Sequence, residues 1–404
     1  MSENVLIAGG GIGGLAAGLA CARAGQNVQI FEQAVAFTEV GAGIQLGPNV
    51  TRILHNWGLA EALASLAAFP THLQVRDAIS GREQGVLRLG KTAEQRYGAP
   101  YATLHRADLH ALLLAAVSQQ TSAICLLESP VTGFVQTPQQ VAVQTSGGRS
   151  FGGDLLLGAD GLWSVVREAL LADGPPRVTG DLAYRALVSQ ATLPAHLRSQ
   201  HITVWLGPDM HVVQYPVRAG EWLNVVGILK ADADRATHAG TATPIDAADD
   251  PSNWDQYTNA SHLRVALAAT CTPLQDLVQA IDSWRRWALC DRPAVRGADQ
   301  FARGRVALLG DAAHPMPPYL AQGAGMAIED AAALGRFLAQ FPGDVHAALQ
   351  AYAQARWQRN ARVQARAVRN GKIFHAKGLV RIGRDAALRV LGERLLDLPW
   401  LYRG

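Results

Sequence analysis

The pattern of hydrophobic and polar residues divides the chain into two kinds of strand-forming region. Short, mostly apolar runs, such as residues 4–8 and 27–31, predict buried strands, as in a parallel sheet covered by helices. Between residues 183 and 229 the pattern changes to an alternation, seen at 201–205 and 212–217, which is typical of strands with one buried face. The chain therefore predicts an α/β region interleaved with a mostly antiparallel sheet.

Composition sets the size of the core and argues against one class of partner. A chain of 404 residues, 49% hydrophobic and 17% charged, can bury a large core and suggests two structural regions. The formal net charge of +3 comes without a lysine-rich block or interleaved basic and aromatic residues. We therefore expect no nucleic-acid partner.

The cysteines favour a reducing compartment. They lie far apart, with neither CxxC nor Cys/His ligand spacing, so the sequence predicts no metal site and no disulfide framework; they are Cys21, Cys125, Cys271 and Cys290. No signal-peptide pattern precedes the strand at residues 4–8, and no uninterrupted apolar stretch of about 18 residues follows it. We expect a cytoplasmic protein without stable membrane insertion.

A glycine-rich turn follows the first apolar strand and precedes the helical run at residues 15–24. In this order, Gly9 makes the tight turn, Gly11 lets the backbone approach a pyrophosphate, and Gly14 lets the helix pack closely on the strand. The N-terminus of the helix offers unpaired N–H groups to the phosphates. The turn therefore predicts a dinucleotide-binding site.

An acidic residue stands where such a site needs it. The strand at residues 27–31 ends at Glu32, whose carboxylate can accept hydrogen bonds from both ribose hydroxyls and excludes a 2′-phosphate. The nucleotide is therefore adenosine-containing, but this motif alone does not separate FAD from NAD.

Three later segments decide between the two cofactors. GADG occupies residues 158–161. GDAAHP occupies residues 310–315, and its first two residues are the end of a predicted buried strand at 304–311. AQGAGMAIEDA occupies residues 321–331. With the first glycine motif, and in this order and spacing, they resemble the single-component, or class A, FAD-dependent aromatic hydroxylases, the relatives of para-hydroxybenzoate hydroxylase. The resemblance covers most of the chain and implies an FAD-binding domain of the Rossmann type.

The resemblance also implies roles for single residues along the cofactor. Glu32 and Arg106 hold the adenosine diphosphate end, and Asp311 holds the ribityl chain. A surface ion pair at a helix start is the alternative for Arg106. For Asp160 a direct role at the flavin and a helix N-cap are both open.

The helix that begins near Gly323 should direct its N–H groups at the C2 carbonyl of the isoalloxazine, where reduction places negative charge. Small residues leave room for a planar ring, and we assign Gly323, Ala324, Gly325 and Met326 to the cofactor. Gln322 either contacts substrate or caps the helix. His314, in the turn before it, is interpreted as structural.

The single dinucleotide fingerprint leaves no separate domain for the reductant. NADH or NADPH is therefore expected to bind transiently. The resemblance implies that the nicotinamide reduces the flavin, and that O2 then forms a C4a-hydroperoxyflavin which hydroxylates the substrate.

The second region carries a further motif. HxxxYP at residues 211–216 resembles a segment of the subgroup that contains 3-hydroxybenzoate 6-hydroxylase, salicylate hydroxylase and 6-hydroxynicotinate 3-monooxygenase. His211 and Tyr215 lie four residues apart on a strand and so face the same way. His211 can accept a phenolic proton, and Tyr215 can hydrogen-bond the same oxygen or a carboxylate. The alternatives are a half-buried histidine and a core tyrosine, both structural.

These features predict a monooxygenase of a small phenolic aromatic acid, with 3-hydroxybenzoate 6-hydroxylation ahead of salicylate and hydroxynicotinate hydroxylation. A flavin hydroxylase of a polyketide, quinone or phenazine is a second class. A non-enzymatic protein of the GDP dissociation inhibitor type, which reuses a related Rossmann scaffold, is a third alternative. The intact glycine motif and GDAAHP argue against it.

The interleaved motifs imply discontinuous domains and a helical C-terminus. A stretch rich in Ala, Asp and Thr at residues 230–255 predicts a mobile surface insertion. The basic tail from residue 362 onward is either an amphipathic membrane-surface helix or, as we favour, helices packed on the flavin domain or at a dimer contact; a homodimer is left open. The predicted division is 1–72, 98–182 and 285–370 for the FAD-binding domain, 73–97 and 183–284 for the substrate-binding domain, and 371–404 for the C-terminal helices.

Overall fold

The computed structural model describes residues 2–37, 42–231, 256–258 and 260–403. Most of the predicted insertion at 230–255 lies outside the described residues. The chain divides into two compact units, described here separately. The first unit is Met1–Glu39, Ala107–Arg177 and Asp291–Val368, and the second is Val40–Arg106, Val178–Cys290 and Arg369–Gly404. The predicted domains placed 40–72 and 98–106 with the flavin-binding part; which unit holds which ligand stays a prediction.

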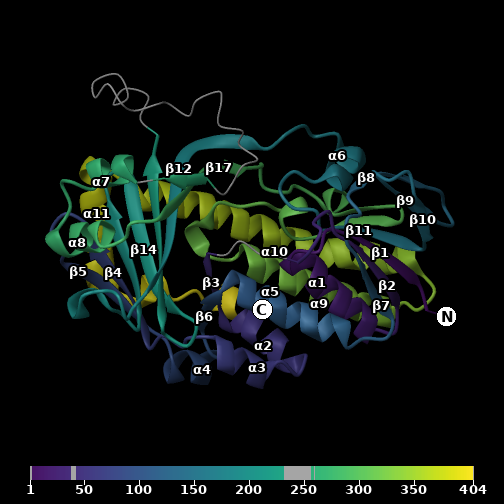
Figure 1. Cartoon of the computed structure of the whole chain (residues 1–404), viewed down its shortest axis with the longest axis horizontal. Helices are drawn as coiled ribbons and strands as arrows, with labels where there is room; N and C mark the ends of the chain where they lie inside the picture. The colour runs from purple at the N-terminus through teal and green to yellow at the C-terminus, as the bar shows by residue number, and fades with distance from the viewer. Residues whose placement is uncertain (1, 38–41, 232–255, 259, 404) are drawn as a thin grey trace. The chain divides into compact units, whose positions relative to one another are not determined.

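A six-stranded sheet forms the centre of the first unit (Figure 1). Its strand order is β18 (Ala302–Arg303), β19 (Val306–Leu308), β11 (Leu155–Gly158), β1 (Asn4–Ala8), β2 (Asn27–Phe31) and β7 (Ala123–Leu126). β1 pairs in parallel with β2 and β11, with Ala8 opposite both Phe31 and Gly158, and β11 pairs in parallel with β19. The carboxyl ends of these strands therefore share one edge of the sheet, from which the predicted nucleotide motifs continue.

The predicted strand at residues 304–311 is too long at its carboxyl end. β19 ends at Leu308, and residues Gly310–Ala312 form a 3-10 turn. Gly310 has a φ of +61°, which a side chain would strain, and the chain turns there instead of continuing the strand.

Two helices with small residues pack against each other in the first unit. α1 (Ile12–Arg23) and α9 (Gly323–Gln340) lie side by side in Figure 1. A Cβ at Gly335 would lie 2.8 Å from the carbonyl oxygen of Ala20, so glycine permits this close approach. The other helices with residues in this unit are α5 (Arg106–Ser118), α6 (Val165–Leu171) and α10 (Val345–Phe374); α5 and α10 have residues in both units.

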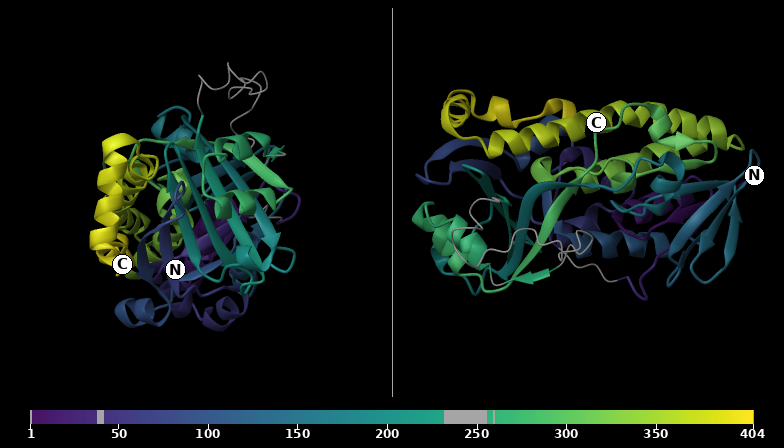
Figure 2. Two further views of the ribbon diagram at one scale, coloured as in Figure 1. Left: turned by 90° about the vertical axis from the view of Figure 1, so that its left-hand side faces the viewer. Right: turned by 90° about the horizontal axis from the view of Figure 1, so that it is seen from above.

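A three-stranded antiparallel sheet completes the first unit. Its order is β10 (Ser150–Gly153), β9 (Val141–Thr145) and β8 (Val131–Gln136). In the right-hand view of Figure 2 it lies near the N-terminus, where the backbone N–H of Asn4 donates to Asp154.

The second unit is built on an eight-stranded sheet, as the alternating pattern predicted. All described pairings but β4–β13 are antiparallel. The strand order is β16 (Gln256–Thr258), β17 (Trp284–Asp291), β12 (Arg177–Ser189), β15 (Trp222–Lys230), β14 (Met210–Val217), β13 (Ile202–Gly207), β4 (His72–Asp77) and β5 (Glu83–Arg88).

The two faces of this sheet differ in what covers them. Met210 and Val212 belong to an apolar cluster with α7 (Ser261–Ala266) and α8 (Thr272–Gln279). Because side chains alternate along a strand, His211, Val213 and Tyr215 lie on the opposite face. We call that side, with the cross-strand residues opposite these three, the His211 face.

The second unit also contains a two-stranded sheet and several helices. β3 (Gly43–Leu46) and β6 (Ala102–His105) pair antiparallel, and the helices are α2 (Pro48–Asn56), α3 (Ala60–Leu66), α4 (Lys91–Tyr97), α11 (Gly378–Leu391), α12 (Glu393–Leu396) and α13 (Pro399–Tyr402).

Two basic residues of the tail, Arg381 and Arg389, contact strands of the second unit. In α11, Arg381 forms an ion pair with Asp77 at 2.7 Å, and Arg389 donates to Gln84 at 2.7 Å. α11 therefore packs on β4 and β5, which fits packed helices and differs from the expected contact with a flavin domain. None of the helices in the described ranges is long and apolar enough to cross a membrane.

Candidate active site

The glycine turn of the first unit has the conformation that its sequence predicts. Gly9 has a φ of +100°, and a Cβ at Gly14 would collide with the carbonyl oxygen of Gly9. A Cβ at Gly11 would meet no atom within 4 Å, so the backbone borders open space there. No side chain caps the N-terminus of α1, whose first turn therefore offers backbone N–H groups to an anion.

Glu32 is fixed at the carboxyl end of β2. Its two carboxylate oxygens accept hydrogen bonds from the backbone N–H groups of Gly10 and Ala34, both at 2.9 Å. His110, which the sequence analysis missed, donates from Nε2 to the carbonyl oxygen of Gly10 at 2.8 Å, because a carbonyl can only accept. The glycine turn is thus held from both sides, and no spacing in the sequence points to His110.

Asp160 stabilises the start of α6. It accepts from the hydroxyl of Ser164 at 2.5 Å and from the backbone N–H of Val166 at 3.1 Å. Ser164 is the N-cap and accepts from the N–H of Arg167 at 2.8 Å. Burial raises the pKa of Asp160. Asp160 therefore supports the N-cap of α6 through Ser164, although it is not the N-cap itself. A direct role of Asp160 at a cofactor stays a prediction.

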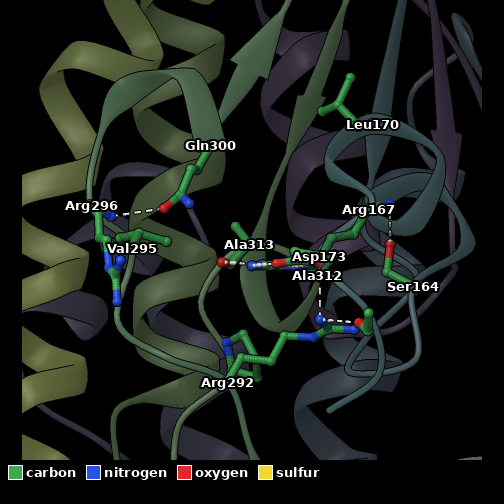
Figure 3. Close-up of polar contacts among 12 residues, drawn as sticks. Ser164, Arg167, Leu170, Asp173, Arg292, Val295, Arg296, Gln300, Ala312 and Ala313 are labelled. Atoms are coloured by element: carbon green, nitrogen blue, oxygen red, sulfur yellow. Dashed lines mark hydrogen bonds and ion pairs between the residues drawn. The ribbon is translucent and has the colours of Figure 1, made fainter.

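Arg167 connects the GADG and GDAAHP segments (Figure 3). Its Nη1 donates to the carbonyl oxygens of Ala312 and Ala313 at 2.8 and 2.7 Å, and its Nη2 pairs with Asp173 at 2.6 Å. Arg292 binds the same carboxylate at 3.0 Å. The sequence analysis missed both arginines, because the contacts of Arg167 with Ala312 and Ala313 and of Arg292 with Asp173 join residues more than 100 positions apart.

Asp311 follows β19 and lies beside the N-terminus of α9. Its carboxylate is exposed, and a Cβ at Gly323 would lie 3.9 Å from its Oδ1. Gln322 is buried and stands at the N-cap position, but its side chain does not cap the helix. The capping alternative for Gln322 is therefore wrong. Gly323 and Ala324 are half-buried, whereas Gly325 and Met326 are buried.

His314 takes part in a buried charge network. Its Nε2 contacts Oδ2 of Asp330 at 2.5 Å, and Arg356 binds Oδ1 of the same carboxylate at 2.7 Å. Burial alone would raise the pKa of Asp330, but His314 and Arg356 outweigh it and hold the pKa at about 2. This network fits the structural interpretation of His314, although the described partner of its ring is a carboxylate and not the backbone.

We expect Asp330→Asn to lower the free energy of unfolding by about 3 kcal/mol at neutral pH, because it leaves a buried arginine with less compensation. The folded pKa of Asp330 is about 2, below the ordinary value. Its contribution is therefore present above about pH 4 and is lost as the pH falls from about 4 towards 2. Urea unfolding at several pH values, with exposed Asp282→Asn as control, should show the gap narrowing in that range. Equal stability at neutral pH would contradict the assignment.

In the second unit, His211 is a buried imidazole on β14. Only 2% of it is exposed, its Nδ1 lies 2.8 Å from Nε2 of His375, and the Phe374 ring packs edge-on with a centroid distance of 5.3 Å. Burial, and to a lesser degree the electrostatic influence of the neighbouring His375, holds the pKa of His211 well below its usual range. His211 is therefore neutral at physiological pH and has a lone pair available for a proton.

Tyr215 shares the face of His211 and is held by its neighbours. A Cβ at Gly43 would lie 2.6 Å from Cε2 of Tyr215, so only glycine fits beside the ring. The cross-strand partner Asn224 accepts from the N–H of Gly43 at 2.6 Å, and its Nδ2 has no hydrogen-bond partner among the residues that the structure describes. Burial raises the pKa of Tyr215, so the phenol keeps its proton and can donate it.

The His211 face also carries a cation that the sequence analysis missed. Arg185 on β12 stands opposite Val226 of β15, which stands opposite Val213, so all three side chains share this face. Arg185 is 5% exposed, and its guanidinium lies 5.2 Å from the centroid of the Trp287 ring. Only the strand register reveals this placement.

The predicted residues thus fall into two groups. The glycine turn, Glu32, Asp160, Asp311 and the start of α9 gather at the carboxyl edge of the six-stranded sheet, whereas His211 and Tyr215 lie on the second unit's sheet. Arg106 belongs to the second unit, is half-buried, and donates its backbone N–H to Ala42 at 2.9 Å.

The residues present in the first unit fit FAD. The open backbone at Gly11 suits a pyrophosphate, and the fixed carboxylate of Glu32 suits ribose hydroxyls. Exposed Asp311, beside a helix N-terminus without a side-chain cap, adds an acceptor and N–H donors for a second part of the cofactor.

Comparison with known proteins agrees with this fit. The family model described as FAD binding domain matches residues 2–367. The chain is 37% identical to a 3-hydroxybenzoate 6-hydroxylase of Polaromonas naphthalenivorans, covering 100% of this chain and 97% of that protein. It is 35% identical to a 6-hydroxynicotinate 3-monooxygenase of Bordetella bronchiseptica, covering 89% of each.

A solved structure matches the fold over nearly the whole chain. Klebsiella pneumoniae HpxO, complexed with FAD and uric acid, has a TM-score of 0.84 and 26% identity, covering 99% of this chain and 96% of that one. The fold, the fit to FAD and the relatives agree, and the chain belongs to the FAD binding domain family as a class A, FAD-dependent aromatic-ring monooxygenase that uses NAD(P)H as reductant.

Proposed function

We propose that this monooxygenase converts 3-hydroxybenzoate to 2,5-dihydroxybenzoate, which is hydroxylation at the 6 position. The observation that carries the proposal is the neutral, buried His211 on the same sheet face as the protonated Tyr215. The relatives named 3-hydroxybenzoate 6-hydroxylase support this choice of substrate, because they match the whole chain at 36 to 37% identity.

The first unit supplies the cofactor residues in this proposal except Arg106, which belongs to the second unit. When bound, FAD would accept hydride from NAD(P)H and transfer one oxygen atom from O2 to the substrate. The backbone of the glycine turn binds the pyrophosphate, Glu32 binds the adenosine ribose, and Asp311 binds the ribityl hydroxyls. Arg106 contacts the adenosine diphosphate end, Asp160 supports the turn before α6, and the first turn of α9, Gly323 to Met326, donates N–H groups to the flavin ring.

The second unit supplies the substrate residues in this proposal except Gln322, which belongs to the first unit. His211 accepts the phenolic proton while oxygen transfers, which makes the ring more electron-rich. Tyr215 donates a hydrogen bond to the substrate, and Gln322 is a further contact. Arg185 provides the positive charge that a carboxylate needs in a site with little water, which favours an aromatic acid over a neutral phenol.

The location and assembly of the enzyme are part of the same proposal. The four cysteines are free thiols, which fits a cytoplasmic protein. A homodimer stays a prediction from the sequence.

A substrate panel tests the proposal. The holoenzyme is given 3-hydroxybenzoate, salicylate or 6-hydroxynicotinate with NADH or NADPH, and both reductant consumed and product formed are measured. We expect fast, coupled turnover with 3-hydroxybenzoate only. Coupled turnover of salicylate or 6-hydroxynicotinate instead would identify that acid as the substrate. If none of the three acids is hydroxylated, a polyketide, quinone or phenazine substrate is favoured.

A further inference from the structure

A second buried histidine contacts His211 on the side of the ring away from Nε2. Nδ1 of His211 and Nε2 of His375 lie 2.8 Å apart, and the exposed fractions of the two residues are 2% and 8%. The two residues are 164 positions apart, so only the fold brings them together.

The backbone around His375 is anchored in several places. At the end of α10, the N–H of His375 donates to Gly371 at 3.1 Å and its carbonyl accepts from the N–H of Asp209 at 3.2 Å. Arg384 of α11 donates to the carbonyl oxygens of Phe374 and Ile373 at 2.8 and 3.1 Å. The backbone that carries His375 is therefore held by contacts with α10, with Asp209 and with α11.

One proton lies between the two facing nitrogens when both rings are neutral. If His375 donates, His211 must carry its own proton on Nε2 and cannot accept another there. If His211 donates from Nδ1, its Nε2 keeps a lone pair. Only the second arrangement makes His211 a base at Nε2.

Charged groups of both signs face His375 from several elements. Asp181 of β12 and Asp209 of the β13–β14 turn favour its charged form, whereas Lys230 of β15 and Arg384 of α11 oppose it. Burial is the largest influence, and it lowers the pKa of His375. A neutral His375 has the lone pair that an acceptor needs.

We propose that His375 is a positioning residue for the hydroxylation: its Nε2 accepts a hydrogen bond from Nδ1–H of His211 and so places the lone pair of His211 on Nε2, the atom that accepts the phenolic proton of the substrate. When His211 takes that proton, the same hydrogen bond becomes charge-assisted and stabilises the imidazolium. This inference rests on the proposed role of His211 as the base.

Two substitutions of His375 separate the effect of its hydrogen bond from the effect of its side-chain volume. In His375→Gln a side-chain carbonyl can still accept from Nδ1–H, whereas His375→Leu removes every acceptor. His346→Leu, the same change at an exposed position of α10, is the matched control. All three are compared with the wild-type holoenzyme.

The first readout needs no turnover. Nitrogen-15 NMR of histidine-labelled oxidised holoenzyme, with His211 assigned by its absence in His211→Gln, reports which ring nitrogen carries the proton. We expect Nδ1 of His211 to be protonated and Nε2 unprotonated in the wild type, with a mixture of tautomers in His375→Leu. A wild-type His211 protonated on Nε2 would overturn the inference.

The second readout follows the substrate. The phenolate absorbance of bound 3-hydroxybenzoate is titrated with pH, and product per NADH is measured alongside. In His375→Leu we expect the midpoint to rise by about one pH unit and coupled hydroxylation to fall about 10- to 100-fold, less than on loss of the base itself. His375→Gln should recover most of both, and His346→Leu should match the wild type.

The outcomes distinguish this inference from the proposed function. If wild type ionises and hydroxylates 3-hydroxybenzoate and all variants do so equally, the role of His375 is refuted and the function stands. If wild type neither binds nor hydroxylates that acid, the substrate proposal fails, and the NMR result still decides on His375. If His375→Leu does not retain FAD, the wild-type tautomer and His375→Gln decide.

Discussion

Replacing His211 with alanine should give a flavin-loaded enzyme that still consumes NADH in the presence of substrate but returns most of the oxygen as H2O2. The phenolic proton then has no acceptor, the ring stays a weak nucleophile, and oxygen transfer slows by about 10²- to 10⁴-fold. Flavin reduction does not need this proton transfer and should change far less. Product and H2O2 per NADH measure the change directly.

Tyr215→Phe is the companion to this experiment. The ring stays wedged beside Gly43, so the variant removes a hydroxyl and little packing. A moderate loss of coupling would assign the hydroxyl to the substrate, and normal coupling would make Tyr215 a core residue. If His211→Ala hydroxylates at an undiminished rate and yield, His211 is structural and the proposed mechanism is wrong.

Glu32→Ala should purify with little FAD. Two ribose hydroxyls would lose a charged acceptor, and each charge-assisted hydrogen bond contributes about 1.5–3 kcal/mol. Together they correspond to a loss of affinity of about 10²- to 10⁴-fold. The flavin-to-protein ratio on purification, and titration of the apoprotein with FAD, measure the effect.

The contacts of Glu32 call for a second variant. Its carboxylate also accepts from the N–H groups of Gly10 and Ala34, so alanine loosens the turn as well. Glu32→Gln keeps one acceptor and should lose less affinity, and exposed Glu61→Ala is the matched control. Stoichiometric FAD with unchanged affinity in Glu32→Ala would show that the nucleotide site has been assigned wrongly.

The local elements of the first unit could be predicted from the sequence because strong short-range signals define them. The strands at residues 4–8 and 27–31 and the start of α9 at Gly323 are confirmed to the residue. Each apolar run is flanked by residues that end a strand or start a helix, and neighbouring segments do not change that preference. The predicted end of the strand at residue 311 was wrong, because the chain turns at Gly310, which has a positive φ.

Long-range neighbours could not be predicted in the same way. His375 directly follows α10 and contacts His211, which lies on β14. Arg185 lies on the His211 face because of the register between β12, β15 and β14. Arg167 and His110 bind backbone carbonyls, and such contacts leave no pattern in the sequence. The chemistry of the site was therefore visible as motifs, whereas the residues that position it required the fold.

The most direct test of the central claim follows the oxygen atom. The holoenzyme is supplied with NADH, 3-hydroxybenzoate and oxygen-18 gas in ordinary water, and the product is examined by mass spectrometry. The account predicts 2,5-dihydroxybenzoate with one heavy oxygen atom, taken from O2, in nearly every molecule. A product whose new oxygen comes from water, or NADH consumption that yields only H2O2 with each acid of the panel, would contradict it.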